Sequence, residues 1–117
     1  MKQGRLRQAR VSDLLKETIT EVLLRKVKDP RVHDLTITGV EVSADLRKAN
    51  VFFCIHGNAL KEEALAGLES AAGFLRHEML GSLDLRRIPE LSFIYDSSFD
   101  YGSHIDELLN KIHIDER

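Results

Sequence analysis

The stretch Ser70-Ala71-Ala72-Gly73-Phe74-Leu75-Arg76 lies inside a long helical pattern and decides how the second half of the chain is interpreted. It places three small residues in a row, ending in glycine, just before the apolar periodicity resumes. Glycine inside a helix costs about 0.5 to 1 kcal/mol relative to alanine. The glycine therefore indicates a bend, a close helix contact or backbone open to a ligand. For the triplet alone, close packing on a sheet is the favoured interpretation.

The helical pattern around this stretch begins near Leu60 and continues to Leu80, where Gly81 offers a stop. Because the small residues interrupt the pattern, it predicts one helix with a hinge or two helices joined at an angle. A β-branched residue at Gly73 is then expected to crowd the helix junction and to destabilise the fold.

Two strands precede this helix. The range 35–43 is rich in β-branched residues, with Gly39 indicating a bulge, and the range 48–56 alternates between two faces. Their short connection predicts an antiparallel hairpin. Phe52 and Phe53 could stack on bases, although aromatic residues in alternating strands more often belong to a core. No cation or base stands beside Cys54 in the sequence pattern, and it is interpreted as a buried spacer.

The chain begins with a helix and ends with a strand and a tail. Apolar residues at helical spacing predict a helix from as early as Leu6 to the stop at Asp29-Pro30. Pro89 opens a third strand over 90–95, a position where a sheet tolerates proline. The tail, residues 99–117, carries an apolar stripe and is expected to be a short peripheral helix.

This order of elements predicts an α+β fold, with a three-stranded sheet covered by helices on one face. It is the type II order of KH-like domains, α-β-β-α-kink-α-β, over residues 1–98. In KH domains a Gly-x-x-Gly loop at the helix junction clamps the nucleotide backbone. Here the equivalent place is Ala71-Ala72-Gly73, which lacks the first glycine.

The composition describes a soluble protein whose charge is unevenly distributed. The 117 residues are 43% hydrophobic and 31% charged, with one cysteine. No apolar run approaches the roughly 18 residues of a membrane span or forms a hydrophobic leader, so a cytoplasmic location without membrane contact is expected. Residues 1–31 hold nine bases against four acids, whereas residues 96–117 hold two bases against six acids. A basic first third is either a solvated surface or a face for a polyanion.

Four stretches together carry a resemblance to a known family. They are Lys28-Asp29-Pro30-Arg31; Val42-Ser43-Ala44-Asp45-Leu46 with Ala49-Asn50-Val51; Ala71-Ala72-Gly73-Phe74-Leu75-Arg76; and the range 86–98, which reads RRIPELSFIYDSS. In this order and spacing the chain resembles the ribosome-binding factor A family, bacterial small-subunit assembly factors. These have a KH-like domain in which an Ala-x-Gly kink replaces the clamping loop.

The resemblance implies a non-enzymatic factor that binds the small ribosomal subunit and its rRNA and assists late 5′-end maturation and processing, chiefly in the cold. It implies a monomer without cofactors, with other assembly factors or a GTPase as further partners. The RNA-binding residues would be those at the kink and at the start of the third strand: Ala71, Ala72, Gly73, Arg76, Arg86 and Arg87. Charge adds Arg5, Arg7, Arg10, Arg25, Lys26, Lys28, Arg31, Arg47 and Lys48 as phosphate contacts.

Two other classes of function have less support in the residues. An enzyme is disfavoured because the histidines form no metal-type pair on one helix and the carboxylates show no recognisable partner. No catalytic or metal residue is therefore predicted. The alternative to a ribosome factor is a general KH-like RNA-binding domain, or a protein-interaction module that uses the open face or the third-strand edge of the sheet.

Overall fold

The computed structural model describes residues 2–82 and 87–98, with side chains from Leu6 to Gly81 and from Arg87 to Ser98. The predicted tail over 99–117 lies outside this part of the chain. The elements are α1 (Lys2–Arg25), the short 3-10 helix η1 (Pro30–Val32), β1 (Leu35–Val42), β2 (Lys48–Ile55), α2 (Lys61–Ser82) and β3 (Glu90–Tyr95).

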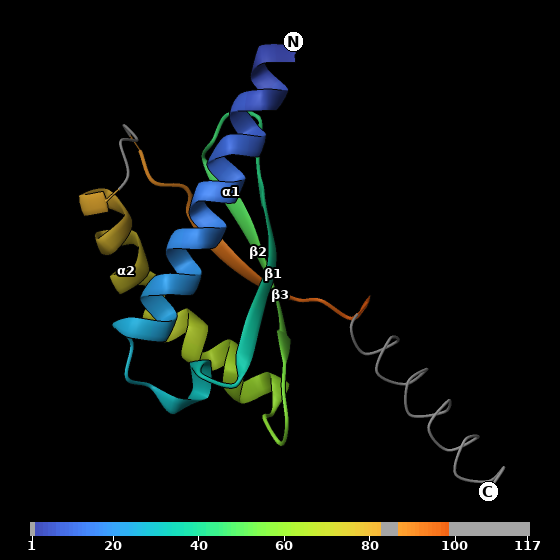
Figure 1. The fold of residues 1–117 in the computed structure, drawn as a ribbon, viewed down its shortest axis with the longest axis vertical. Coiled ribbons are helices and arrows are strands. Elements are labelled where there is room, and N and C mark those ends of the chain that lie inside the picture. The colour runs from blue at the N-terminus through green and yellow to red at the C-terminus, as the bar shows by residue number, and fades with distance from the viewer. Residues whose placement is uncertain (1, 83–86, 99–117) are drawn as a thin grey trace, which may run out of the picture.

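The three strands form one sheet in the order β1-β2-β3. β1 and β2 pair antiparallel, and their register shifts between Ile37 and Gly39, which confirms the predicted hairpin and its bulge. β3 runs parallel to β2, with Lys48 opposite Glu90, and α2 makes the crossover that a parallel pair requires. Both helices cover the same face of the sheet, as predicted (Figure 1).

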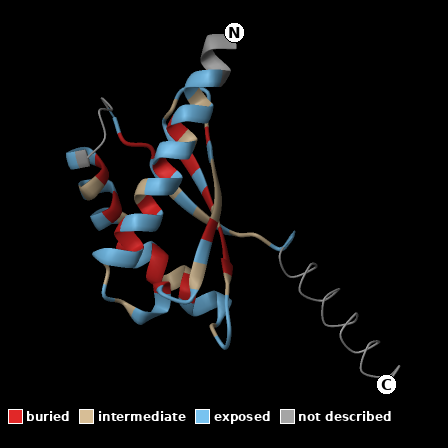
Figure 2. Cartoon of the chain, viewed as in Figure 1, coloured by how far each residue is buried: buried red, intermediate tan, exposed pale blue. Residues whose placement is uncertain are grey.

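α1 contributes one continuous apolar stripe to the core. Val11, Leu15, Ile19 and Val22 recur at helical spacing, and all four are buried. Figure 2 shows the buried residues of α1 and α2 on the sides that face the sheet. The predicted amphipathic helix is therefore confirmed, and it begins before Leu6.

α2 is one unbroken helix, so the alternative of two separate helices is wrong, although its two halves do not follow one straight line (Figure 1). Gly73 has no positive φ, and a Cβ at this position would meet nothing within 4 Å. The expected crowding at Gly73 is therefore also wrong. The reason is that Gly73 lies on the exposed side of the helix, where no other element approaches.

The close approach in α2 occurs at Gly67 instead. A Cβ at Gly67 would lie 2.9 Å from the Cβ of Arg31 and 2.9 Å from Cγ1 of Val32. Ala64, Gly67 and Ala71 are all buried and spaced three and four residues apart, so they form a strip of small side chains along α2. This strip lets η1 pack directly against the helix backbone.

The alternation along β2 separates a core face from an open face. Phe53 is fully buried beneath the helices, and its ring lies 5.7 Å from that of Tyr95 in an edge-on arrangement. Phe52 points to the open face and is half-buried beside Gly39 and Ile94 in the register. Cys54 is 4% exposed, which confirms the predicted buried spacer.

Candidate nucleic-acid interface

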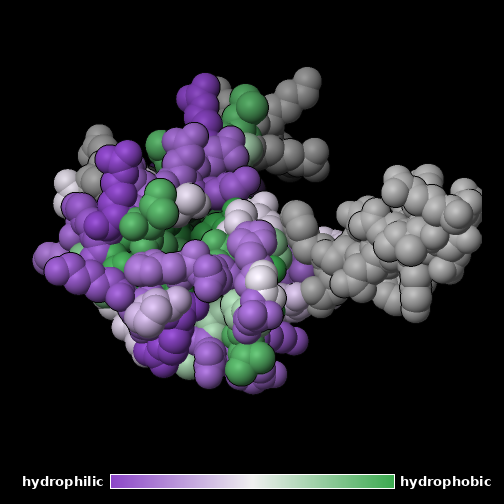
Figure 3. Space-filling view, turned by 60° about the horizontal axis from the view of Figure 1, so that its bottom comes forward, coloured by the Kyte–Doolittle hydropathy of each residue, from purple (hydrophilic) through white to green (hydrophobic). Residues whose placement is uncertain are grey.

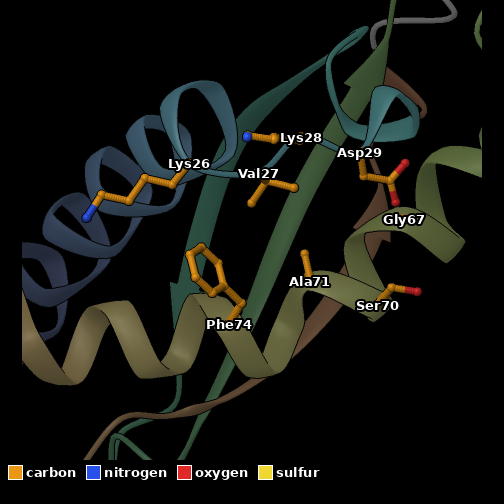
Figure 4. A pocket seen from close by; sticks show the side chains of 8 residues that line it. All are labelled: Lys26, Val27, Lys28, Asp29, Gly67, Ser70, Ala71 and Phe74. Atoms are coloured by element: carbon orange, nitrogen blue, oxygen red, sulfur yellow. The ribbon is translucent and has the colours of Figure 1, made fainter.

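A groove lies between the segment that leaves α1 and the middle of α2 (Figure 4). It encloses about 310 Å³ and is lined by Lys26, Val27, Lys28 and Asp29 on one side and by Gly67, Ser70, Ala71 and Phe74 on the other. The basic exit of the first helix and the small-residue stretch of α2 were separate predictions from sequence. The structure brings them together as the two walls of one groove.

Local capping and one ion pair hold the first wall in place. Asp29 precedes η1, and its Oδ1 accepts a hydrogen bond of 3.0 Å from the backbone N–H of Arg31, while Pro30 begins the short helix. The carbonyl of Val27 lies 2.7 Å from Nε2 of His33. Lys26 Nζ reaches across to Glu78 Oε2 at 2.9 Å and so links α1 to α2 beside the groove.

The charges around the groove are partly neutralised within the protein. Arg31 forms a two-point contact with Asp29, the shortest distance being 2.7 Å, and Lys26 is paired with Glu78. Within the described chain, Lys28 makes no ion pair and stays exposed at the rim. It is the groove's cation best placed to meet an external phosphate.

The opposite wall presents apolar surface to solvent. Phe74 is 41% exposed, and its ring rises from α2 toward Val27 on the other wall (Figure 4). Gly67 lines the groove at the point where η1 packs against α2. Figure 3 brings the end of the molecule where α1 finishes toward the viewer. Apolar side chains form small patches there among hydrophilic ones. A flat ring beside a cation can accept the face of a planar ligand such as a nucleobase.

The predicted residues of the kink do not all face this groove. Ala71 lines it, whereas Ala72 is half-buried and Gly73 is exposed on the far side of the helix. Arg76 follows Phe74 by two residues, which turns it about 200° around the helix axis. Arg76 is therefore exposed on the opposite flank of α2 from Phe74, and the groove and this cation form separate surfaces.

The other predicted cations divide between the two ends of α1. Arg25 lies near the groove end, where it meets Glu21 at 3.8 Å. Arg7, Arg10, Arg47, Lys48 and Arg87 are exposed at or near the other end of the molecule. The Arg5 side chain and all of Arg86 fall outside the described residues.

Five groove residues were absent from the predicted RNA-binding residues: Val27, Asp29, Gly67, Ser70 and Phe74. A signal for the α2 members was present, because Gly67, Ser70, Ala71 and Phe74 recur at the spacing of three and four residues that places them on one helix face. Nothing in the sequence pattern indicated that the α1 exit would pack opposite them.

Residues 2–82 and 87–98 contain neither a candidate metal site nor a membrane-spanning helix. This part of the chain holds no group of three histidine, cysteine, aspartate or glutamate side chains that could bind a metal ion. None of its helices is both long and apolar enough to span a membrane.

Asp29 makes the stability of this region depend on pH. Hydrogen bonds from the side chain and then from the backbone of Arg31 lower the pKa of Asp29 below its ordinary value of 3.8. Since the folded-state pKa is lowered, the stabilisation is present above the unfolded value and is lost as the pH falls through the folded one. We expect Asp29→Asn to reduce the difference in unfolding free energy between about pH 7 and about pH 3, measured by urea titration. Asp13→Asn, at an exposed position on α1, is the control, and an equal reduction in both variants would contradict this role.

Comparisons with known proteins identify close relatives over nearly the whole chain. The family model described as ribosome-binding factor A matches residues 7–109. A ribosome-binding factor A from Syntrophobacter fumaroxidans is 50% identical over 113 residues, covering 94% of this chain and 97% of the relative. One from Syntrophus aciditrophicus is 51% identical over 111 residues, covering 94% of this chain and 90% of the relative.

Solved structures agree with the sequence relatives. The crystal structure of ribosome-binding factor A from Thermus thermophilus matches with a TM-score of 0.69 and 27% identity, over 75% of this chain and 93% of that one. A second match is a homology model of the Thermus thermophilus protein, fitted into the cryo-EM map of a 30S–RbfA complex. It has a TM-score of 0.61 and 27% identity, over 74% of this chain and 91% of that one. The predicted KH-like α+β fold is confirmed, and the chain belongs to the ribosome-binding factor A family.

Proposed function

We propose that this protein is a non-enzymatic assembly factor that binds the small ribosomal subunit through its rRNA and assists late 5′-end maturation and processing, with its greatest importance in the cold. The observation that carries the proposal is the groove between α1 and α2, in a chain whose relative was fitted into a 30S complex. The factor would act in the cytoplasm as a monomer, alongside other assembly factors or a GTPase.

The groove supports binding to RNA backbone and unpaired bases. Lys28 at the rim offers a cation to phosphate, and the exposed Phe74 ring offers a stacking surface. The small side chain of Ala71 keeps this part of the wall low, so that a strand can lie close to the α2 backbone. Ala72, Gly73 and Arg76 would contact RNA only from the other flank of α2.

Such a factor works by shifting populations of RNA conformers. If the protein binds one local rRNA fold more tightly than its alternatives, it favours that fold by the difference in binding free energy. No bond is made or broken in this process. Low temperature slows the escape of RNA from wrong conformers, which fits a role that matters most in the cold.

Co-sedimentation with purified ribosomal subunits across a salt series tests the proposal. We expect the chain to pellet with small subunits in preference to large ones, with an affinity that falls as salt rises. Equal pelleting with both subunits, or indifference to salt, would contradict the proposed function.

Lys28→Gln tests the groove within the same experiment. If Lys28 neutralises one phosphate, the slope of log K against log [salt] should become shallower by roughly 0.7 to 0.9. Lys61→Gln removes the same charge from the start of α2, away from the groove, and should leave the slope unchanged. Identical slopes in the two variants would remove Lys28 from the interface.

A further inference from the structure

Three segments that are distant in sequence meet at the end of the molecule opposite the groove. The Nε2 amide of Gln8 in α1 donates a hydrogen bond of 3.0 Å to the carbonyl of Val42, where β1 ends. The backbone N–H of Glu90 donates one of 2.8 Å to the carbonyl of Arg47, so β3 starts beside the hairpin turn. We call the cations carried by these segments the basic end: Arg7, Arg10, Arg47, Lys48 and Arg87.

The cations of the basic end form no ion pairs within the described structure. The ion pairs among the described residues occupy Arg25, Lys26 and Arg31, all at the groove end. None of the five cations of the basic end has an ion pair or a side-chain hydrogen bond within the described structure, and all five are exposed. More unpaired cations are therefore available to a partner here than at the groove.

The nearby acids reduce this charge but form no ion pair with its cations. Asp45 forms hydrogen bonds within the hairpin turn: its Oδ1 accepts one of 2.6 Å from Ser43 Oγ and one of 3.1 Å from the backbone N–H of Arg47. Glu90 is opposite Lys48 in the sheet register but forms no ion pair with it. Asp13 and Glu41 are exposed and likewise unpaired in the described chain.

α1 fixes the distance between the basic end and the groove. Arg10 and Lys26 are sixteen residues apart along the helix and its continuing last turn, which corresponds to about 24 Å. α1 packs on the sheet along most of this length, so the two surfaces are held apart rigidly. A contact of one or two nucleotides at the groove therefore cannot also reach the basic end.

We propose that the basic end is a second phosphate-binding surface and that the protein bridges two separate segments of rRNA, one at each end of α1. This proposal rests on the proposed function and adds a second, distinct contact to it. Exposed arginine and lysine without aromatic neighbours suit a phosphate backbone better than a protein surface, whose contact centres are apolar. The described side chains of the basic end include no aromatic ring.

Site-directed crosslinking tests the bridge in the complex with small subunits. Ala44→Cys places a thiol on the exposed hairpin turn, and Ser70→Cys places one at the groove. Each would carry a photoreactive maleimide, while the native Cys54 is buried and should stay unlabelled. We expect position 44 to crosslink to one rRNA segment and position 70 to a different one. Ser92→Cys, exposed on the open face of the sheet, controls for chance proximity.

The salt dependence gives a second readout that does not depend on labelling. Arg47→Gln/Lys48→Gln should make the slope for small-subunit binding shallower by roughly 0.7 to 0.9 for each phosphate that is no longer neutralised. Lys16→Gln/Lys61→Gln removes the same charge from exposed positions elsewhere and should leave the slope unchanged. Unchanged melting temperatures in both double variants would show that a difference in slope reflects binding and not unfolding.

The outcomes separate this inference from the proposed function. If the wild-type chain does not bind small subunits, the proposed function itself fails. If it binds, the bridge is overturned by position 44 crosslinking to ribosomal protein, to no RNA, or to the same segment as position 70. Equal salt slopes for the two double variants would also overturn it.

Discussion

Gly67→Leu is expected to destabilise the protein by at least about 1 to 3 kcal/mol, the usual cost of forcing extra atoms into a packed site. A single Cβ at Gly67 would already lie 2.9 Å from atoms of both Arg31 and Val32, and leucine adds three more carbons. α2 and η1 would have to separate, which would also deform the groove. For a domain of this size each kcal/mol lowers the melting temperature by roughly 4 to 8 °C, measurable by circular dichroism.

Gly73→Leu is the matched control, with the same substitution six residues further along the same helix, on its exposed side. Its Cβ meets nothing within 4 Å, and leucine has the better helix propensity, so the variant should be as stable as the parent or slightly more so. A comparable loss at both glycines would mean that α2 itself, and not the contact with η1, is sensitive. Should Gly67→Leu fail to fold, Gly67→Ala provides the smaller perturbation.

Phe53→Ala is expected to cost about 3 to 5 kcal/mol of unfolding free energy, the range for removing a buried aromatic side chain. Phe53 is fully buried in the central strand, between the helices and the sheet, and it contacts the ring of Tyr95. Its removal leaves a cavity that the rigid neighbours on both sides cannot fill. Equilibrium unfolding in urea measures the loss.

Phe52→Ala tests the neighbouring side chain on the opposite face. Phe52 is only half-buried, so the same substitution should cost clearly less stability. If small-subunit binding nevertheless falls, the open face takes part in recognition, as the alternative of a stacking surface would require. Equal stability losses for Phe52→Ala and Phe53→Ala would contradict the assignment of the two faces.

The elements of the fold were predictable because local patterns determine them. The alternation in β2, the β-branched run of β1 and the proline before β3 each identify a strand, and the observed limits agree within a residue or so. The role of Gly73 was not predictable in the same way. A glycine signals only that a side chain is missing, and whether another element approaches that point depends on tertiary packing.

The candidate site was predictable in its parts but not in its assembly. The sequence indicated Ala71 on α2 and the lysines after α1, yet only the fold shows that they face each other across a groove. The sequence also could not show which cations already form ion pairs within the protein. Arg31 and Lys28 look equivalent in the sequence. In the structure Arg31 forms an ion pair with Asp29, whereas Lys28 is exposed.

The parallel pairing of β3 with β2 has a consequence for the order of folding. Lys48 meets Glu90 across a separation of some forty residues, whereas the hairpin strands meet across a turn of a few. Local contacts close first because short loops lose less chain entropy. During synthesis the hairpin and α2 therefore emerge with one edge of β2 still unpaired, and the core closes only when Tyr95 has left the exit tunnel. The protein would thus carry an incomplete sheet until β3 has left the ribosome.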